Sequence, residues 1–362
     1  MKSRKPIVAN TFLKATFIFC AATFWTPVAN SQVVSDGSKA GRSPITFPMA
    51  LSWLPADTET LIVANGPFVM PQRQNAEEET KSRLLSLKEI RETFESLPLG
   101  LVGLQQGALE KKFTGREVAF AIEGARSFRS PSGLGEMTYE GCDIVVFTHD
   151  VTSLGVAFME DSKGVATKFE EVEGQRVGVF DKKMEEDIWT TMVAFPKGNV
   201  LVVATDRDYL RGVLARIGGA GGPRALPDGL PEWKYVNIDD HAWGLRHYDK
   251  RQAEMDPSSP IGGEKSANIP DDDAIGIVFN LDASRGRTAT ITYLSKAKDV
   301  LAVVKANLFP PGSEEDSVKD LRIRYREIGP GVVRASFDLM HSEPVWYFTF
   351  VLMAVLGHGV YL

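Results

Sequence analysis

Residues 190–217 read TTMVAFPKGNVLVVATDRDYLRGVLARI, and this stretch decides the expected fold class. Two runs rich in β-branched and aliphatic residues, Thr190–Phe195 and Asn199–Thr205, lie on either side of Pro196-Lys197-Gly198. Two such runs joined by so short a turn are typical of an antiparallel hairpin. The segment therefore predicts two paired strands that lead directly into a helix.

The pattern changes to helical spacing after the hairpin. Apolar side chains recur every three or four residues, which places them on one face of a helix. They are Tyr209, Leu210, Val213, Leu214 and Ile217. Thr205 is the expected N-cap of this helix, and Gly218-Gly219 is its expected end.

The rest of the chain shows a similar order of elements. Before residue 190 we expect strands at 117–123, 143–148, 166–173 and 176–181 and a helix at 152–162. After residue 231 we expect strands at 273–282, 288–294, 321–327 and 332–339 and helices at 297–308 and 344–356. Both parts give strand, strand, helix, hairpin, helix, with one additional hairpin in the first. We therefore predict an α+β protein with helices packed on antiparallel sheets, in two related halves.

The expected halves are separated by a Gly/Pro-rich connection. The first α+β half covers residues 51–217, the connection covers 218–231, and the second half covers 232–362. Glycine and proline concentrated in this way are typical of a boundary between structured units.

Residues 1–31 have the three parts of a secretory signal peptide. A basic start is followed by the apolar residues 15–25 and by the small-residue exit Ala29-Asn30-Ser31. The apolar part is too short for a permanent membrane helix, so we expect cleavage after Ser31; an uncleaved anchor or a transit segment is the alternative. Residues 32–50 are polar and are expected to form a flexible tether. The sequence thus predicts export to the periplasm, the cell surface or the extracellular space.

Loss of the signal peptide changes the charge and the cysteine content. The whole chain has a formal net charge of −6, and residues 1–31 carry four basic residues and no acid, so the mature chain carries −10. An acidic chain without a basic stripe is a poor match for nucleic-acid binding. Cys20 leaves with the signal peptide, and we expect the remaining thiol, Cys142, to be buried at the start of a strand.

The C-terminal residues Val345–Leu362 contain no charged side chain. Their length allows a membrane association. However, Ser342-Glu343-Pro344 has the form of a helix start and Gly357 that of a helix end. A buried core helix of about 13 residues, near 20 Å long, is therefore favoured, and a membrane anchor is the alternative.

The chain lacks the strong catalytic and nucleotide-binding motifs. The one polar concentration with metal-ligand chemistry consists of Asp240, His241, His247 and Asp249. A strand through 242–248 would carry His247 on one face, and imidazole and carboxylate groups together can bind a divalent metal. The alternative is that Asp239-Asp240 occupies a turn and that His247 pairs with a carboxylate.

The segment Leu54-Pro55-Ala56-Asp57-Thr58 leads into an expected first strand behind the signal peptide and tether. It resembles the opening of bacterial exported proteins grouped in families of unknown function, and the likeness continues loosely through Val200–Ile217. The resemblance implies export and a repeated α+β body. It implies no activity, cofactor or catalytic residue.

Three functions agree with these patterns. The leading hypothesis is a non-catalytic exported protein that binds another protein or a small ligand. The second is a metal-dependent hydrolase or lyase centred on Asp240, His241, His247 and Asp249, with a divalent metal as cofactor. The third is an envelope protein anchored through Val345–Leu362.

Overall fold

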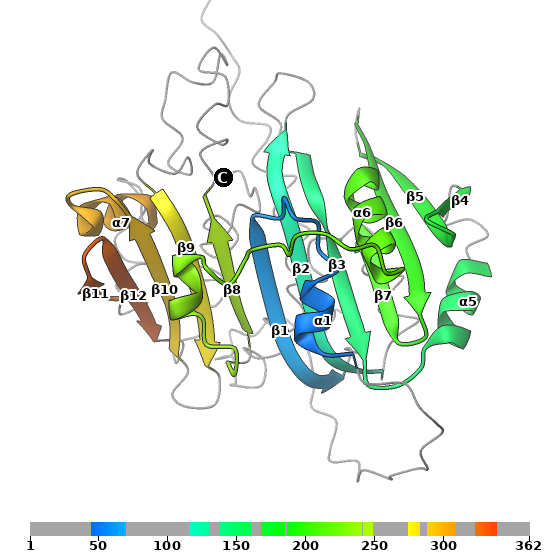
Figure 1. Ribbon diagram of the computed structural model, residues 1–362, viewed down its shortest axis with the longest axis horizontal. Helices are drawn as coiled ribbons and strands as arrows, with labels where there is room; N and C mark the ends of the chain where they lie inside the picture. Colours follow the sequence, from blue (N-terminus) through cyan, green and yellow to red (C-terminus); the bar gives the residue numbers. More distant parts are fainter. Residues whose placement is uncertain are drawn as a thin grey trace, which may run out of the picture.

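The computed structural model describes residues 45–69, 116–129, 138–160, 168–184, 187–240, 242–248, 274–282, 288–308 and 323–338. Twelve strands form one antiparallel sheet (Figure 1). They are β1 (Thr60–Val69), β2 (Glu117–Arg129), β3 (Thr138–Phe147), β4 (Lys168–Val172), β5 (Gln175–Met184), β6 (Asp187–Lys197), β7 (Val200–Ala204), β8 (Ala242–His247), β9 (Ala274–Asp282), β10 (Thr288–Ser295), β11 (Arg324–Gly329) and β12 (Val332–Asp338). The described helices are α1 (Phe47–Leu51), α5 (Thr152–Glu160), α6 (Arg207–Ile217), the 3-10 helix η4 (Pro231–Tyr235) and α7 (Val300–Leu308).

The strand order corrects the predicted fold class. From one edge to the other the order is β11-β12-β10-β9-β8-β1-β2-β3-β7-β6-β5-β4. The predicted α+β arrangement, with helices packed on antiparallel sheets, is therefore wrong: the molecule is mostly one large sheet with few short helices. The physical reason is the pairing of β1 with β8, which joins two strand edges that would otherwise expose unpaired N–H and C=O groups.

Most individual elements lie where local patterns place them. The expected hairpin is β6 and β7, and its register pairs Met192 with Ala204. Helix α6 follows and ends at Gly218, as expected. The expected N-cap, Thr205, is wrong by one residue, because the carboxylate of Asp206 accepts the hydrogen bond from the backbone N–H of Tyr209 at 2.7 Å.

The strand order is the same when it is followed outward from the centre in either direction. On one side the neighbours are β1, β2, β3, β7 and β6, and on the other they are β8, β9, β10, β12 and β11. Helix α5 follows β3, and helix α7 follows β10. Strands β4 and β5 are additional on the first side. We call the strands from β1 outward the first arm and those from β8 outward the second arm; each of the five strands of the second arm therefore has a counterpart in the first.

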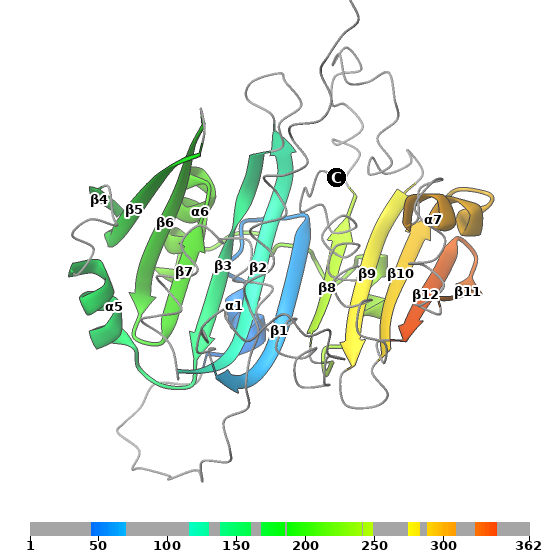
Figure 2. The same cartoon turned by 180° about the vertical axis from the view of Figure 1, so that it is seen from behind.

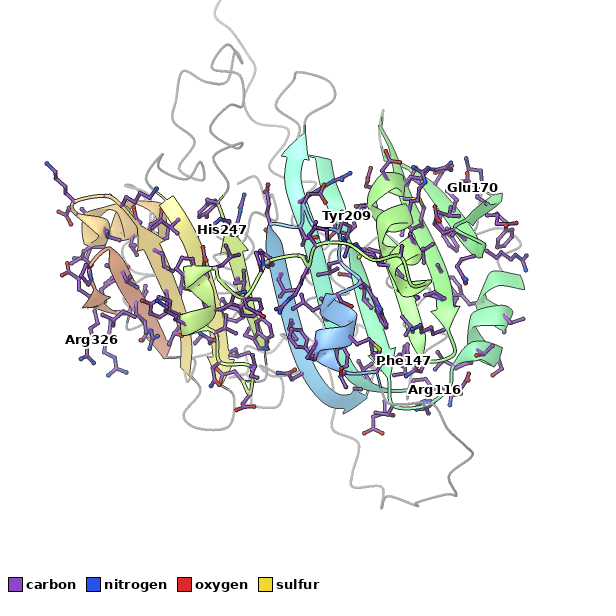
Figure 3. The ribbon with its side chains drawn as sticks, viewed as in Figure 1. Arg116, Phe147, Glu170, Tyr209, His247 and Arg326 are labelled. Carbon is purple, nitrogen blue, oxygen red and sulfur yellow. The ribbon has the colours of Figure 1, made fainter. Side chains whose placement is uncertain are left out.

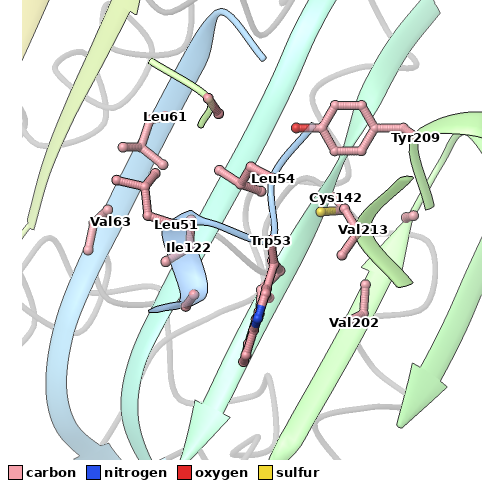
Figure 4. Packing of buried hydrophobic residues seen from close by; sticks show 14 of the residues in the cluster. Leu51, Trp53, Leu54, Leu61, Val63, Ile122, Cys142, Val202, Tyr209 and Val213 are labelled. Carbon is pink, nitrogen blue, oxygen red and sulfur yellow. The ribbon is translucent and has the colours of Figure 1, made fainter. Parts of the chain in front are cut away.

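The sheet has two differently covered faces. Helices α1, η4 and α6 lie on the face nearest the viewer in Figure 1, which we call the α6 face. Its core contains Leu61, Ile122 and Val202 (Figure 4). The opposite face, seen in Figure 2, carries Val145 and Val203 with Phe158 of α5, and we call it the α5 face.

The Leu54–Thr58 segment fixes the start of β1 against α6. Leu54 is fully buried, and it packs where Gly124 of β2 has no side chain. The hydroxyl of Thr58 donates to the carbonyl of Pro55 at 2.7 Å and lies 2.8 Å from the hydroxyl of Tyr209 on α6. The segment that carries the sequence resemblance therefore has a structural role here: it closes the α6 face of the core.

The ends of the chain are only partly described. Helix α1 lies at the end of the range expected to be a tether, and the side chain of Thr46 caps it. The expected signal peptide, residues 1–31, and the apolar run Val345–Leu362 lie outside the described residues. Within the described ranges, no helix is both long enough and apolar enough to cross a membrane.

Candidate functional site

The predicted metal ligands do not come together where the structure describes them. Asp240 precedes β8, and its carboxylate accepts a hydrogen bond from the side-chain amide of Asn237 at 2.5 Å. His247 is the last residue of this six-residue strand, and Asp240 precedes its other end, about 16 Å away along the strand. Asp240 and His247 therefore do not ligate one ion. His241 and Asp249 lie outside the described residues.

His247 lies beside a buried carboxylate. Its Nδ1 is 2.8 Å from Oε1 of Glu232 on η4, the 3-10 helix that contacts β8 and β9. Glu232 is fully buried, and it occupies the space above Gly276, where a Cβ would lie 2.0 Å from the carboxylate. This pair fixes η4 to the sheet, which is a structural role for both side chains.

A group of three arginines lies at the edge formed by β11 and β12. Arg324 and Arg326 of β11 are exposed, and Arg334 of β12 is half-buried beside them. Arg326 pairs directly with Arg334 across the two strands, and Nε of Arg334 donates to Oγ1 of Thr292 at 3.2 Å. Figure 3 shows Arg326 at this edge of the sheet. We call these three arginines the arginine surface.

Cross-strand pairing places the arginine surface on the α6 face. One row of directly paired residues runs across the whole sheet: Arg326, Arg334, Thr292, Val278, Leu245, Leu61, Gly124, Cys142, Ala204, Met192, Val179 and Lys168. Counted outward from the central pair, Arg334 corresponds to Ala204 and Arg326 corresponds to Met192. Both counterparts are buried in the hydrophobic core. The same row of residues is therefore part of the hydrophobic core at β7 and β6 and forms a basic surface at β12 and β11.

The arginine surface carries charge that no carboxylate neutralises in the described structure. The ion pairs among the described residues involve none of Arg324, Arg326 and Arg334. Like charges directly opposite each other on paired strands are destabilising. By contrast, Glu170 at the other sheet edge is held by Lys168 and Arg207. An anion bound at the arginine surface would remove the repulsion between Arg326 and Arg334.

Part of the arginine surface could be predicted from the sequence. The spacing of Arg324 and Arg326, two residues apart in an expected strand, places both on one face. The position of Arg334 could not be read in the same way. Its register against Arg326 depends on the irregular pairing between Glu327 and Gly329, which residue types alone do not specify.

A second polar feature lies buried on the α5 face. Glu123 of β2 and Asp143 of β3 are directly paired, and each side chain is 1% exposed. Neither carboxylate oxygen of Asp143 has a hydrogen-bond partner among the described residues. Burial, and secondarily the neighbouring Glu123, raises the pKa of Asp143 well above its usual value of 3.8.

The expected burial of Cys142 is confirmed, but its expected position at the start of a strand is wrong, because β3 begins four residues earlier, at Thr138. Cys142 lies in β3 on the α6 face, within the core cluster, and is 2% exposed. Burial raises the pKa of its thiol, and Asp143 and Glu123 raise it further. A thiol that stays protonated is a poor nucleophile, so Cys142 is a core residue.

Comparisons with known proteins return no relative for this chain. No family model matches it, and no curated protein or solved structure matches it. The resemblance of Leu54–Thr58 to exported bacterial proteins stays a prediction.

The buried Asp143 predicts an unusual pH dependence of stability. Because its pKa is raised in the folded state, its favourable contribution is complete below pH 3.8 and is lost as the pH rises through the folded pKa. We expect Asp143→Asn to flatten this loss of stability between pH 4 and pH 8, because the amide that replaces the carboxyl group does not titrate. Denaturant unfolding of the full chain at both pH values measures it.

The matched control is Asp208→Asn, which changes an exposed carboxylate on α6. This variant should keep the pH dependence of the unmodified protein. An equal pH dependence in the Asp143→Asn variant and the unmodified protein would show that Asp143 does not carry the effect.

Proposed function

We propose that this protein is an exported, non-catalytic binding protein whose arginine surface binds a carboxylate-bearing ligand. The observation that carries the proposal is the cluster of Arg324, Arg326 and Arg334 on one sheet face with no carboxylate in the described structure to neutralise it. In a chain with a net charge of −6, this local excess of positive charge runs against the overall composition. A local charge of this kind favours one class of ligand, which is anionic.

The chemistry of arginine suits this ligand. Each guanidinium offers a planar set of N–H donors that matches the two oxygens of a carboxylate. The hydrogen bond from Arg334 to the buried hydroxyl of Thr292 reduces the freedom of one guanidinium before a ligand arrives. Arg324 and Arg326, which are exposed, complete a site that a ligand can reach from solvent.

The proposed export rests on the sequence. Residues 1–31 have the basic start, apolar stretch and small-residue exit of a signal peptide. Cys142, which has no partner after loss of Cys20, is buried in the core, and a buried thiol is protected from oxidation.

Processing of the N-terminus tests the export. Expression of the full chain in a bacterium, followed by fractionation and N-terminal sequencing, should give a processed protein that begins at Gln32. Recovery of the intact N-terminus in the cytoplasm would contradict export and would leave the binding site untouched.

Binding of an acidic polymer tests the site. Poly-L-glutamate should bind the mature protein at low salt, and Arg324→Gln combined with Arg326→Gln should weaken binding at least about tenfold, because two of the three cations are lost. Fluorescence anisotropy of a labelled polymer measures the affinity. Binding should also weaken as salt is added, since these charges are exposed.

A matched control separates the site from general charge. Arg211→Gln removes an exposed arginine on α6 that is paired with Asp208, and it should leave the affinity unchanged. Equal affinity of the arginine double variant and the unmodified protein would refute the proposed site.

A further inference from the structure

We infer that the ligand of the arginine surface is an acidic segment of a partner protein that binds as an additional extended strand along β11. This inference rests on the proposed function and specifies the ligand's class and conformation. Three features of β11 support it: its position in the sheet, the spacing of its arginines and the chemistry of its other face.

Strand β11 is at the edge of the sheet. It pairs only with β12, and it lies at the outer end of the strand order of the described residues (Figure 1). An edge strand presents a row of main-chain N–H and C=O groups that an extended segment can pair with. The ladder with β12 is regular from Arg324 to Glu327 and shifts between Glu327 and Gly329. A partner strand therefore has a regular template from Arg324 to Glu327.

The spacing of the arginines matches an extended partner. Arg324 and Arg326 are two residues apart on one face of a strand, which separates their Cα atoms by about 6.6 Å. A paired strand repeats its own side chains on that face with the same period. A partner with an acidic residue at every second position would therefore place one carboxylate beside each arginine.

The opposite face of β11 favours neutral residues between the acids. Tyr325 lies on the α5 face, and the ammonium of Lys305 on α7 lies 5.5 Å from its ring centroid. Glu327, also on this face, is exposed and would repel an acidic neighbour. The partner sequence that fits best alternates acidic residues with β-branched or aromatic residues, which also favour extended backbone.

The other edge of the sheet lacks this combination. At β4 the one acidic side chain on the α6 face, Glu170, is already paired with Lys168 and Arg207. Phe169 on the other face is covered on one side by the guanidinium of Arg176, which lies 4.3 Å from the ring centroid. Among the described strands, β11 is thus the edge that combines an open ladder with unneutralised charge.

The arginines could have two other roles: they could protect the sheet edge from unwanted pairing, or they could bind a small anion. Each role gives its own result in a peptide-binding experiment. Charged residues on edge strands also prevent unwanted pairing between sheets, and in that case no acidic peptide binds. A small anion such as citrate could instead fill the site without any strand pairing. A peptide that pairs as a strand must meet requirements on spacing and on backbone N–H groups that neither alternative imposes.

The experiment compares three short peptides of equal length, each about nine residues, with the mature full-length protein. The first alternates Glu with Val or Thr, the second has the same composition with its Glu residues consecutive, and the third is the alternating peptide with N-methyl groups on alternate amides of one edge. We expect the alternating peptide to bind at least about tenfold more tightly than either of the others. Arg324→Gln combined with Arg326→Gln should abolish this preference, and Arg211→Gln should keep it. Unchanged circular dichroism and an unfolding midpoint no lower than that of the unmodified protein confirm that the variants are folded.

The outcomes separate the inference from the proposed function. Equal, arginine-dependent binding of all three peptides, or tight binding of citrate with no preference among peptides, overturns strand addition and leaves the proposed anion site standing. Absence of arginine-dependent binding for every peptide and for citrate overturns both, and assigns the charges to edge protection.

Discussion

The pairing of β1 with β8 is the interaction on which the rest of the structure depends. The register runs from Thr60 opposite Arg246 to Ala64 opposite Ala242, and the N–H of His247 extends it by donating to the carbonyl of Glu59 at 2.9 Å. This ladder turns two sets of strands into one sheet. Because it occupies the edges at the centre, the outer strands β11 and β4 become the edges of the whole sheet.

The continuous sheet also explains why the α6 face is apolar in one part of the molecule and basic in another. In the arm that contains β3 and β7, the α6 face is apolar and is covered by α1 and α6. In the other arm, the corresponding positions change from Val278 through Thr292 to Arg334 and Arg326. Burial of an uncompensated guanidinium is costly, so the arginines stand at the rim, where solvent and ligands can reach them. At the proposed binding site the sheet therefore carries charged side chains at positions whose counterparts on β7 and β6 belong to the hydrophobic core.

Local patterns predicted the strands well and their assembly poorly. The hairpin of β6 and β7 and the apolar face of α6 depend on neighbours within a few residues, so their sequence was sufficient. The ladder between β1 and β8 joins segments far apart in the chain, and nothing in either segment specifies the other. The fold class was wrong for this reason.

The candidate site was likewise predictable only where local residue spacing determines it. Arg324 and Arg326 share a face by simple alternation, but Arg334 joins them only through a register that an irregular turn sets. The proposed metal ligands Asp240 and His247 are close in sequence, yet an extended strand separates them. Closeness along a strand is not closeness in space, because each residue advances the chain by about 3.3 Å.

Hydrogen exchange across β1 and β8 is the most direct test of the single sheet. We expect the amides in 60–64 and 242–246 that donate to the ladder to exchange as slowly as the amides that join β2 to β3, because both ladders open only when the sheet unfolds. Fast exchange along both β1 and β8, with slow exchange retained on either side of them, would contradict the continuous sheet by showing two separate ones.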